Sequence, residues 1–335
     1  MKAKYNAYDM NREPLYMNVP LHTPYGINIE PTSYCNLKCN YCVHALTSDE
    51  LKKRDFSLGY MELNLFKEII EQTKQFPGKI KKITFSGLGE PVLHQQLPEM
   101  VQLIKNSNIA SEILLNTNAI LLNKEIIDVL IAAGLSEIKI SLQGVTNDKY
   151  KQYCNTQVDY NKLYENIVYL SEHKKSCVLK VKIPETALND EEKKTFISNY
   201  ENLCDYIGFE TLHDQFPGVN YSDKIKANKS TSRFGREYKE LNVCPVPFYR
   251  CSIRWDGRVT LCMPDNMRDT DQYISNSTLF DIWNGITRNE LLKSHLVGKR
   301  RNNKRCSYCF NPEYVSLPDD ILDGHEEDIL KRIEV

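Results

Sequence analysis

The sequence predicts an α/β protein, a partial (β/α)6 TIM-like barrel followed by a small cysteine-rich domain with a β-hairpin. Short apolar runs alternate with amphipathic stretches from residue 26 to residue 210, and most cysteines gather in two clusters at opposite ends of the chain. Strands separated by helices form a parallel sheet through right-handed crossovers. A complete eight-stranded barrel usually takes about 250 residues, so this shorter region favours six units.

The elements follow one another in a regular order along the barrel region. Six apolar runs are predicted strands: Ile27–Glu30, Ile80–Ser86, Ile113–Asn116, Glu137–Leu142, Cys177–Ile183 and Tyr206–Glu210. Two stretches between them carry apolar residues at helical spacing: Leu65, Phe66, Ile69, Ile70 and Phe76 in one, and Leu97, Met100, Val101 and Ile104 in the other. Alternation of the two patterns predicts the repeated strand–helix unit.

The composition excludes several classes of protein. Of 335 residues, 43 are Lys or Arg and 44 are Asp or Glu, so the net charge is −1 and no basic excess points to a nucleic-acid partner. With 41% hydrophobic residues the chain can form a core, but no apolar run approaches the about 18 residues of a membrane span. The N-terminal residues contain no hydrophobic segment typical of a secretion signal. We therefore expect a soluble, cytoplasmic protein that binds neither nucleic acid nor membrane.

Changes in composition divide the chain into five segments. A stretch rich in Pro, Gly, Asn, Ser and Lys is typical of a linker, and the region after it is too short to form a large core alone. A bound metal centre would supply the missing stability there. The predicted segments are an N-terminal extension 1–23, a core domain 24–212, a linker 213–243, a cysteine-rich domain 244–317 and a C-terminal tail 318–335.

The first cysteine cluster comes directly after the first predicted strand of the barrel. An odd total of eleven cysteines without a secretion signal favours metal ligation over a disulfide framework. Cys35, Cys39 and Cys42 supply three thiolates, and three ligands leave one coordination position of a metal centre open. The alternative is a closed structural zinc site in which His44 is the fourth ligand.

The CxxxCxxC spacing, with Tyr41 just before the third cysteine, strongly resembles that of the radical S-adenosylmethionine (SAM) enzymes. The resemblance extends over the whole α/β region. It implies that Cys35, Cys39 and Cys42 bind a [4Fe–4S] cluster whose open iron chelates the amino and carboxylate groups of SAM. Such a cluster takes its electron from an external one-electron donor such as flavodoxin or ferredoxin.

The resemblance also implies SAM contacts at the ends of successive strands. The segment from Ser86 to Pro91 resembles the family's glycine-glycine-glutamate motif, although Leu88 replaces one of the glycines. Ala119 likewise stands where a related asparagine-rich segment has glycine, and Lys182 or Glu185 on the fifth strand is a further candidate. The predicted cofactor-binding residues are Tyr41, Gly87, Gly89, Glu90, Asn116, Asn118, Ser141 and Gln143.

The second cysteine cluster lies around a predicted hairpin. Asp256-Gly257 predicts a tight turn between the strands Ile253–Trp255 and Val259–Leu261. By spacing alone the cysteines around it fit a zinc ribbon as well as an iron–sulfur site. The region resembles the SPASM/twitch extension of radical SAM enzymes, which implies one auxiliary [4Fe–4S] cluster, and the ligands that match are Cys244, Cys262, Cys306 and Cys309.

Four cysteines outside the proposed ligand sets and one basic run are also notable. Cys251 stands where relatives usually carry an apolar residue, and Cys154, Cys177 and Cys204 are expected to be small buried hydrophobes. The basic run from 299 to 305 predicts a solvated loop, or a patch for an acidic or phosphorylated substrate.

The resemblance implies an oxidoreductase that generates a 5′-deoxyadenosyl radical and removes a hydrogen atom from its substrate. We expect it to oxidise or epimerise a sugar or another small polar metabolite, with the auxiliary cluster as electron acceptor. The candidates for the proton-transferring group are His213, Asp214 and Glu210, together with His94. The alternatives are a peptide-modifying maturase with the same parts and a non-enzymatic zinc-binding protein.

Overall fold

In the computed structural model, the strands of the chain form a single, mostly parallel sheet. The structure describes residues 2–5, 12–54, 56–212, 231–234, 236–237, 239–262, 272–303, 306–307 and 309–333. Within these residues nine strands join in the order β1-β7-β6-β5-β4-β3-β2-β8-β9, and only β8 and β9 are antiparallel neighbours. The strands are β1 Lys4–Tyr5, β2 Gly26–Ile29, β3 Ile80–Phe85, β4 Ala110–Thr117, β5 Glu137–Ser141, β6 Val178–Pro184, β7 Tyr206–Glu210, β8 Arg250–Ile253 and β9 Val259–Thr260.

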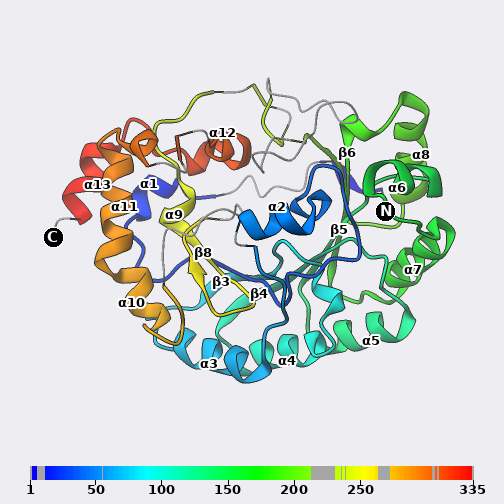
Figure 1. Ribbon diagram of the computed structural model, residues 1–335, viewed down its shortest axis with the longest axis horizontal. Helices are drawn as coiled ribbons and strands as arrows, with labels where there is room; N and C mark the ends of the chain where they lie inside the picture. The colour runs from blue at the N-terminus through cyan, green and yellow to red at the C-terminus, as the bar shows by residue number, and fades with distance from the viewer. Residues whose placement is uncertain are drawn as a thin grey trace.

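Helices cover the outer face of this sheet and gather beyond its β8–β9 edge. Figure 1 shows α3, α4, α5 and α7 in an arc around the strands, with α10 beside α3 at the left end of this arc and α11 and α13 near α1. Their bounds are α1 Leu15–Asn18, α2 Ser48–Lys53, α3 Leu63–Thr73, α4 Leu97–Ser107, α5 Lys124–Ala133, α6 Asn147–Cys154, α7 Tyr160–His173, α8 Asp190–Tyr200, α9 Val246–Tyr249, α10 Leu279–Asn284, α11 Ile286–Leu296, α12 Asn311–Val315 and α13 Glu326–Ile333.

The apolar stripes read from the sequence become the buried faces of the helices. Leu97, Met100, Val101 and Ile104 of α4 are all buried, as their helical spacing predicts. Side-chain caps fix where helices begin: Thr47 and Glu50 form a capping box on α2, and Asn189 and Glu192 form one on α8. The six predicted barrel strands all form, so the α/β fold class is confirmed.

The predicted hairpin forms too, but its first strand is displaced and joins the barrel. β8 covers Arg250–Ile253 instead of Ile253–Trp255, and β9 covers Val259–Thr260. β8 lies parallel to β2, with Arg250 opposite Gly26, so tertiary pairing rather than the local turn pattern sets where the strand begins. The C-terminal region therefore continues the barrel sheet, and β1 extends its other edge beside β7.

Two hydrophobic clusters hold the parts together. The main core runs through the barrel and includes Ile253, Val259 and Trp283 of the C-terminal region. A second cluster packs Leu15 near the N-terminus against Ile329 of α13.

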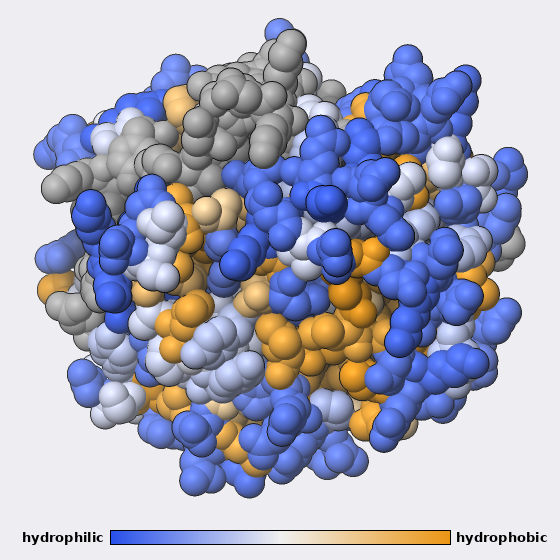
Figure 2. Space-filling model, turned by 45° about the vertical axis from the view of Figure 1, so that its right-hand side comes forward, coloured by the Kyte–Doolittle hydropathy of each residue, from blue (hydrophilic) through white to orange (hydrophobic). Residues whose placement is uncertain are grey.

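Figure 2 shows apolar residues in the middle of the visible face, surrounded by hydrophilic ones. Among the helices of the described residues, none has both the length and the apolar character needed to cross a membrane.

Candidate active site and metal centres

A cavity of about 490 Å³ lies at the carboxyl ends of the barrel strands. Successive side chains on a strand point to opposite faces, so alternate residues of each strand reach this space. The barrel residues that line it include Asn28, Glu30, Thr84, Ser86, Gly87, Asn116, Lys139, Ser141, Gln143, Lys182 and Glu210. Arg250, Ser252, Arg254, Arg258, Thr260, Asn311 and Tyr314 line it from the C-terminal region. Barrel and C-terminal region thus share one cavity.

The loop with the first three cysteines forms one wall of this cavity. Tyr41 and Cys42 line it, and the backbone N–H of Cys42 donates to the carbonyl of Cys39 at 2.8 Å. Burial, helped by charge on Glu90, Cys39 and Cys42, raises the pKa of the Cys35 thiol to about 12. The three thiols are therefore close enough to interact electrostatically. His44 contacts the carbonyl of Leu88 at 2.8 Å through Nε2, which anchors the loop to the segment after β3.

The glycine-rich segment after β3 packs closely against the chain that precedes these cysteines. A Cβ on Gly89 would lie 2.6 Å from the carbonyl oxygen of Tyr34 and even closer to that of Thr32. Only glycine allows two backbone segments to approach this closely. A Cβ on Gly87 would meet the Glu30 carboxylate, which accepts from the backbone N–H of Leu88 at 2.9 Å. These glycines thus allow protein segments to pack together at the cysteine loop.

Glu90 joins two strand ends rather than facing the cavity. Its buried carboxylate accepts from Thr117 Oγ1 at 2.6 Å and from the backbone N–H of Asn118 at 2.7 Å. Burial raises the pKa of Glu90 to about 6, although these hydrogen bonds oppose the shift. The Asn118 side chain donates to Asn36 at 2.7 Å, and this bond connects the end of β4 to the cysteine loop.

Of the residues predicted to contact SAM, Tyr41, Gly87, Asn116, Ser141 and Gln143 line the cavity. Gly89, Glu90 and Asn118 lie in the supporting loops just described. Tyr41 donates to the side chain of Gln143. Asn116 Oδ1 is buried and accepts no hydrogen bond from any described residue, so it remains available to a ligand.

The candidates for proton transfer are only partly brought together. Glu210, at the end of β7, lines the cavity and pairs with Lys182 and Arg233. Burial alone raises the pKa of Glu210, but the charges of Arg233 and Lys182 outweigh it and lower the pKa to about 2. His213 and Asp214 lie outside the described residues.

Two other candidates from the sequence lie away from the cavity. His94 Nε2 contacts the carbonyl of Met61 at 2.9 Å, and its Nδ1 accepts from the backbone N–H of Gln96 at 3.2 Å. Glu185 pairs with Lys193 at 2.9 Å and is exposed. Lys182, in contrast, does line the cavity.

Lys139, which is not among the residues predicted from the sequence, lines the cavity from the middle of β5. Burial lowers the pKa of Lys139 to about 8; Glu137 opposes that shift and Lys182 adds to it. A neutral amine within reach of neutral pH is a proton acceptor. Alternation along Glu137–Ser141 was the available signal, because it places Lys139 on the same face as Ser141.

The second cysteine set lines a separate cavity of about 50 Å³. Cys244, Cys262, Cys306 and Cys309 all border it, and burial raises the pKa of Cys262, with charge on the other three thiols raising it further. Thr260 and Asn311 border both this cavity and the large one. The four thiols are therefore neighbours of the space inside the barrel.

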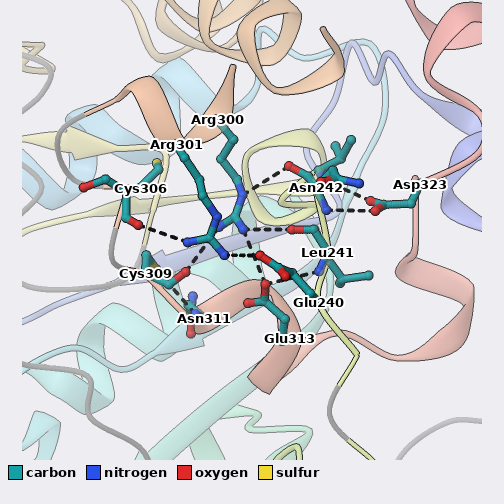
Figure 3. A network of polar contacts seen from close by, with 12 residues as sticks. Glu240, Leu241, Asn242, Arg300, Arg301, Cys306, Cys309, Asn311, Glu313 and Asp323 are labelled. Carbon is teal, nitrogen blue, oxygen red and sulfur yellow. Dashed lines mark hydrogen bonds and ion pairs between the residues drawn. The ribbon is translucent and has the colours of Figure 1, made fainter. Parts of the chain in front are cut away.

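A buried arginine holds the backbone around this thiol set, as Figure 3 shows. Arg300 is 2% exposed and donates to the carbonyls of Leu241, Asn242 and Cys309 at 2.8, 3.1 and 3.2 Å. It also pairs with the buried carboxylate of Glu313 at 3.4 Å. The expectation that this basic run forms a solvated loop is therefore wrong at Arg300. Its side chain is buried because its partners come from other segments, which local composition does not reveal.

None of the eleven cysteines, all of them described, forms a disulfide. Cys251, Cys154, Cys177 and Cys204 are buried, which confirms the expectation for the latter three. Cys154 Sγ lies 3.4 Å from Cys39 Sγ. Across the described residues no group of three or more His, Cys, Asp and Glu side chains is placed to hold a single metal ion.

Comparison with known proteins identifies the family. Residues 29–196, half of the chain, match the model of the Radical SAM superfamily. The chain belongs to this superfamily. Residues 244–310 match the SPASM model, an iron–sulfur cluster-binding domain, so the predicted pairing of a radical SAM core with a C-terminal SPASM region is confirmed.

Curated relatives of this radical SAM protein are distant. It is 29% identical over 258 residues to a tungsten-containing aldehyde ferredoxin oxidoreductase cofactor-modifying protein of Pyrococcus furiosus, covering 70% of this chain and 69% of that one. It is 29% identical over 210 residues to a GTP 3′,8-cyclase of Aquifex aeolicus, covering 59% and 62%. The chain thus spans about three fifths of the length of that cyclase.

Solved structures show the same fold. BtrN in complex with AdoMet and 2-DOIA aligns with a TM-score of 0.55 at 19% identity, over 87% of this chain and 95% of that chain. Streptococcus suis SuiB bound to S-adenosylmethionine aligns with a TM-score of 0.63 at 17% identity, over 91% and 79%. Both likenesses are at the level of the fold.

The two matched domains imply SAM and [4Fe–4S] clusters as cofactors. The chain's residues fit them. Three thiols lie on one loop, whose Cys42 lines a cavity with an amide oxygen that no described residue hydrogen-bonds, and four further thiols share a second cavity. Thiolates are the usual ligands of such clusters, and none of these seven cysteines forms a disulfide.

Proposed function

We propose that this chain is a SAM-cleaving oxidoreductase that dehydrogenates or epimerises a sugar or another small polar metabolite in the large cavity. The observation that carries the proposal is the wall of Thr260 and Asn311, which separates that cavity from the cavity of the second thiol set. A substrate held in the barrel would lie next to both proposed metal centres. That arrangement suits an oxidation in which two electrons leave the substrate in separate steps.

When bound, SAM and its cluster supply a 5′-deoxyadenosyl radical that removes a hydrogen atom, and the auxiliary cluster supplies an acceptor for the second electron. Cys35, Cys39 and Cys42 would hold the first cluster. Tyr41, Gly87, Asn116, Ser141 and Gln143 would contact SAM, since they line the cavity around that loop. Gly89, Glu90 and Asn118 would position the loop through the contacts described above.

Lys139 is the group we propose as proton acceptor. Oxidation of a substrate C–H next to a hydroxyl releases a proton from that hydroxyl as the carbonyl forms. Lys139 reaches the cavity, and its pKa of about 8 leaves a fraction of the amine neutral at physiological pH. Glu210, with a pKa of about 2, is the weaker base of the two, so we assign it to holding Lys182 and Arg233 in place.

Cys244, Cys262, Cys306 and Cys309 would hold the auxiliary [4Fe–4S] cluster. Arg300 supports this site through the carbonyl of Cys309 and through the segment that leads into Cys244. Zinc is the competing occupant, since four cysteines also suit a structural zinc site. The match to an iron–sulfur cluster-binding domain favours iron.

The charged side chains that line the cavity support a small polar metabolite over a peptide. Among the structural neighbours, BtrN was solved with 2-DOIA and SuiB with its precursor peptide SuiA, so the fold accommodates either class. A flavodoxin or a ferredoxin would deliver the electron to the first cluster. A survey of glycans and peptides, read out by 5′-deoxyadenosine release, would distinguish the two substrate classes.

Iron and acid-labile sulfide per chain after anaerobic reconstitution test the proposal. We expect about eight irons in the wild type and about four in a Cys35/Cys39/Cys42→Ala variant, because each cysteine set holds one [4Fe–4S] cluster. A matched Cys177→Ala/Cys204→Ala variant, which removes two buried cysteines outside both sets, should keep about eight. Four irons falling to none would refute the auxiliary cluster, and zinc without iron would refute the enzyme.

A further inference from the structure

The hairpin of the C-terminal region places arginines on the inner face of the barrel. β8 lies parallel to β2 with Gly26 opposite Arg250 and Asn28 opposite Ser252. The pairing continues past the strand end, because the backbone N–H of Glu30 donates to the carbonyl of Ile253 at 2.9 Å. Arg254, two residues after Ser252, therefore lies beside Glu30. Arg250 and Arg254 therefore face the same space as Asn28 and Glu30.

Among the described residues that line this cavity, positive charges outnumber negative ones. Two carboxylates of the described residues line it, Glu30 and Glu210, while the cations that do so are Lys139, Lys182, Arg233, Arg250, Arg254 and Arg258. Glu210 already pairs with Lys182 and Arg233. Placing so many cations in a partly desolvated space is unfavourable unless an anion accompanies them.

Arg250 and Arg254 keep unused hydrogen-bonding capacity. Nε of Arg250 is buried without a hydrogen-bond partner, and Arg250 has no ion pair with any residue that the structure describes. Arg254 contacts Glu30 through a single nitrogen at 3.4 Å. A guanidinium offers five N–H donors in a planar fork that matches a carboxylate or a phosphate. Both side chains thus keep donors for an oxyanion.

SAM does not account for this excess. Its sulfonium and ammonium groups are positive and its carboxylate is negative, so SAM carries one net positive charge, which the net negative charge of a [4Fe–4S]²⁺ cluster on three thiolates only balances. Neither cofactor therefore offsets the cations of the cavity, and the anion comes from another molecule that shares the space. Arg258, by comparison, is already engaged with Asp256 at 3.5 Å and with the Tyr273 hydroxyl at 2.6 Å.

We propose that the substrate of this cavity carries an oxyanion, a phosphoryl or carboxylate group, which Arg250 and Arg254 of the hairpin bind. This inference rests on the proposed function, since it assumes that substrate binds where the barrel and the C-terminal region meet. The oxyanion is anchored on the hairpin wall, and the rest of the molecule extends toward the wall that carries Tyr41 and Cys42. The hairpin thus acts as the specificity element of the site.

Binding to the reconstituted holoenzyme with SAM tests the inference without requiring turnover. The probes are glucose 6-phosphate, glucuronate, inorganic phosphate and uncharged glucose, titrated by calorimetry at two salt concentrations. We expect at least one anionic probe to bind roughly tenfold or more tightly than glucose and to weaken as salt rises. The phosphate and glucuronate arms distinguish a phosphoryl group from a carboxylate.

Arginine variants assign that affinity to the hairpin. Arg250→Gln and Arg254→Gln should each weaken the anionic probe roughly 10- to 100-fold, because each loses charged hydrogen bonds. Arg254→Lys keeps the charge but loses the fork, and should weaken binding less than Arg254→Gln. Arg332→Gln, a matched change on α13 outside the cavity, should leave probe binding unchanged. Iron content and SAM affinity, measured on every variant, report whether the fold and the cofactor sites are intact.

The outcomes separate this inference from the function on which it rests. Equal affinity for glucose and all anionic probes, or wild-type affinity of the arginine variants for the anion, would overturn the oxyanion assignment while iron and SAM binding still support the enzyme. Failure of the wild type to bind iron and SAM would overturn the proposed function itself.

Discussion

The two cysteine sites use the same ligand atom but are built in opposite ways. The barrel site has three cysteines within eight residues of one loop, beside a cavity of about 490 Å³. The C-terminal site gathers cysteines from residues 244 to 309 around about 50 Å³. Backbone packing of neighbouring loops supports the first site, whereas a buried Arg300 and Glu313 support the second. The cysteines of the barrel site can therefore be recognised from a short stretch of sequence, whereas those of the C-terminal site are brought together by tertiary structure.

The largest effect should come from breaking the assembled site at Arg300. Arg300→Met leaves the Glu313 carboxylate and three backbone carbonyls without their buried partner. Removing one member of a buried ion pair typically costs about 3–5 kcal/mol. We therefore expect a loss of that size in the free energy of unfolding, measured by denaturant titration, together with loss of the auxiliary iron.

The neighbouring arginine provides the control. Arg301 pairs with Glu240 at 2.7 Å and donates to the carbonyl of Ser307 at 3.0 Å, both at the surface, where an exposed ion pair contributes about 0–1 kcal/mol. Arg301→Met should therefore keep nearly wild-type stability and iron content. Equal losses in the two variants would mean that the C-terminal site does not depend on the buried pair.

A second prediction concerns chemistry in the large cavity. Lys139→Met should lower product formation roughly 10²- to 10⁴-fold, the usual contribution of a general base, while SAM binding and iron content persist. Since burial lowers the pKa of Lys139 to about 8, the neutral amine that accepts a proton predominates above that pH. Wild-type turnover should accordingly rise as the pH rises through about 8.

Two variants sharpen the assignment of this pH dependence. Lys139→Arg keeps the positive charge but cannot lose its proton, so it should be as inactive as Lys139→Met. Lys81→Met, on the exposed part of β3, should keep both the activity and the rising profile. If Lys139→Met kept a measurable rate with an unchanged pH profile, the proton acceptor would be a group other than Lys139.

How far the sequence predicts each site follows from the same comparison. Alternating patterns predicted all six barrel strands, and the spacing of Cys35, Cys39 and Cys42 predicted the loop at the cavity wall. The parallel pairing of β8 with β2 was not predicted, because it joins residues more than two hundred positions apart, and no local pattern specifies such a partner. Arg300 was misread for the same reason, since its partners lie in other segments.

A third prediction tests whether backbone packing supports the barrel site. Gly89→Ala places a Cβ against the carbonyls of Thr32 and Tyr34, which are backbone atoms that cannot rotate away. Overpacking of this kind costs about 1–3 kcal/mol, and the shifted loop should lose iron from the first site. Gly78→Ala is the matched control, because its Cβ would lie 3.6 Å from Thr23 Oγ1 at ordinary contact distance. Full iron retention in Gly89→Ala would show that the cysteine loop tolerates movement.

The smallest effect should follow from Cys154→Ala, which tests where the ligand set of the barrel site ends. Cys154 is fully buried on α6, and its Sγ lies 3.4 Å from Cys39 Sγ, close enough to be mistaken for a fourth ligand. Because Cys154 lies on α6, outside the loop that carries the three-cysteine motif, we expect about eight irons to remain. The missing sulfur leaves a void about the size of a methyl group, which costs about 0.5–1.5 kcal/mol. Loss of about four irons would instead make Cys154 a ligand, and the barrel site would then depend, like the C-terminal one, on a residue supplied by the tertiary fold.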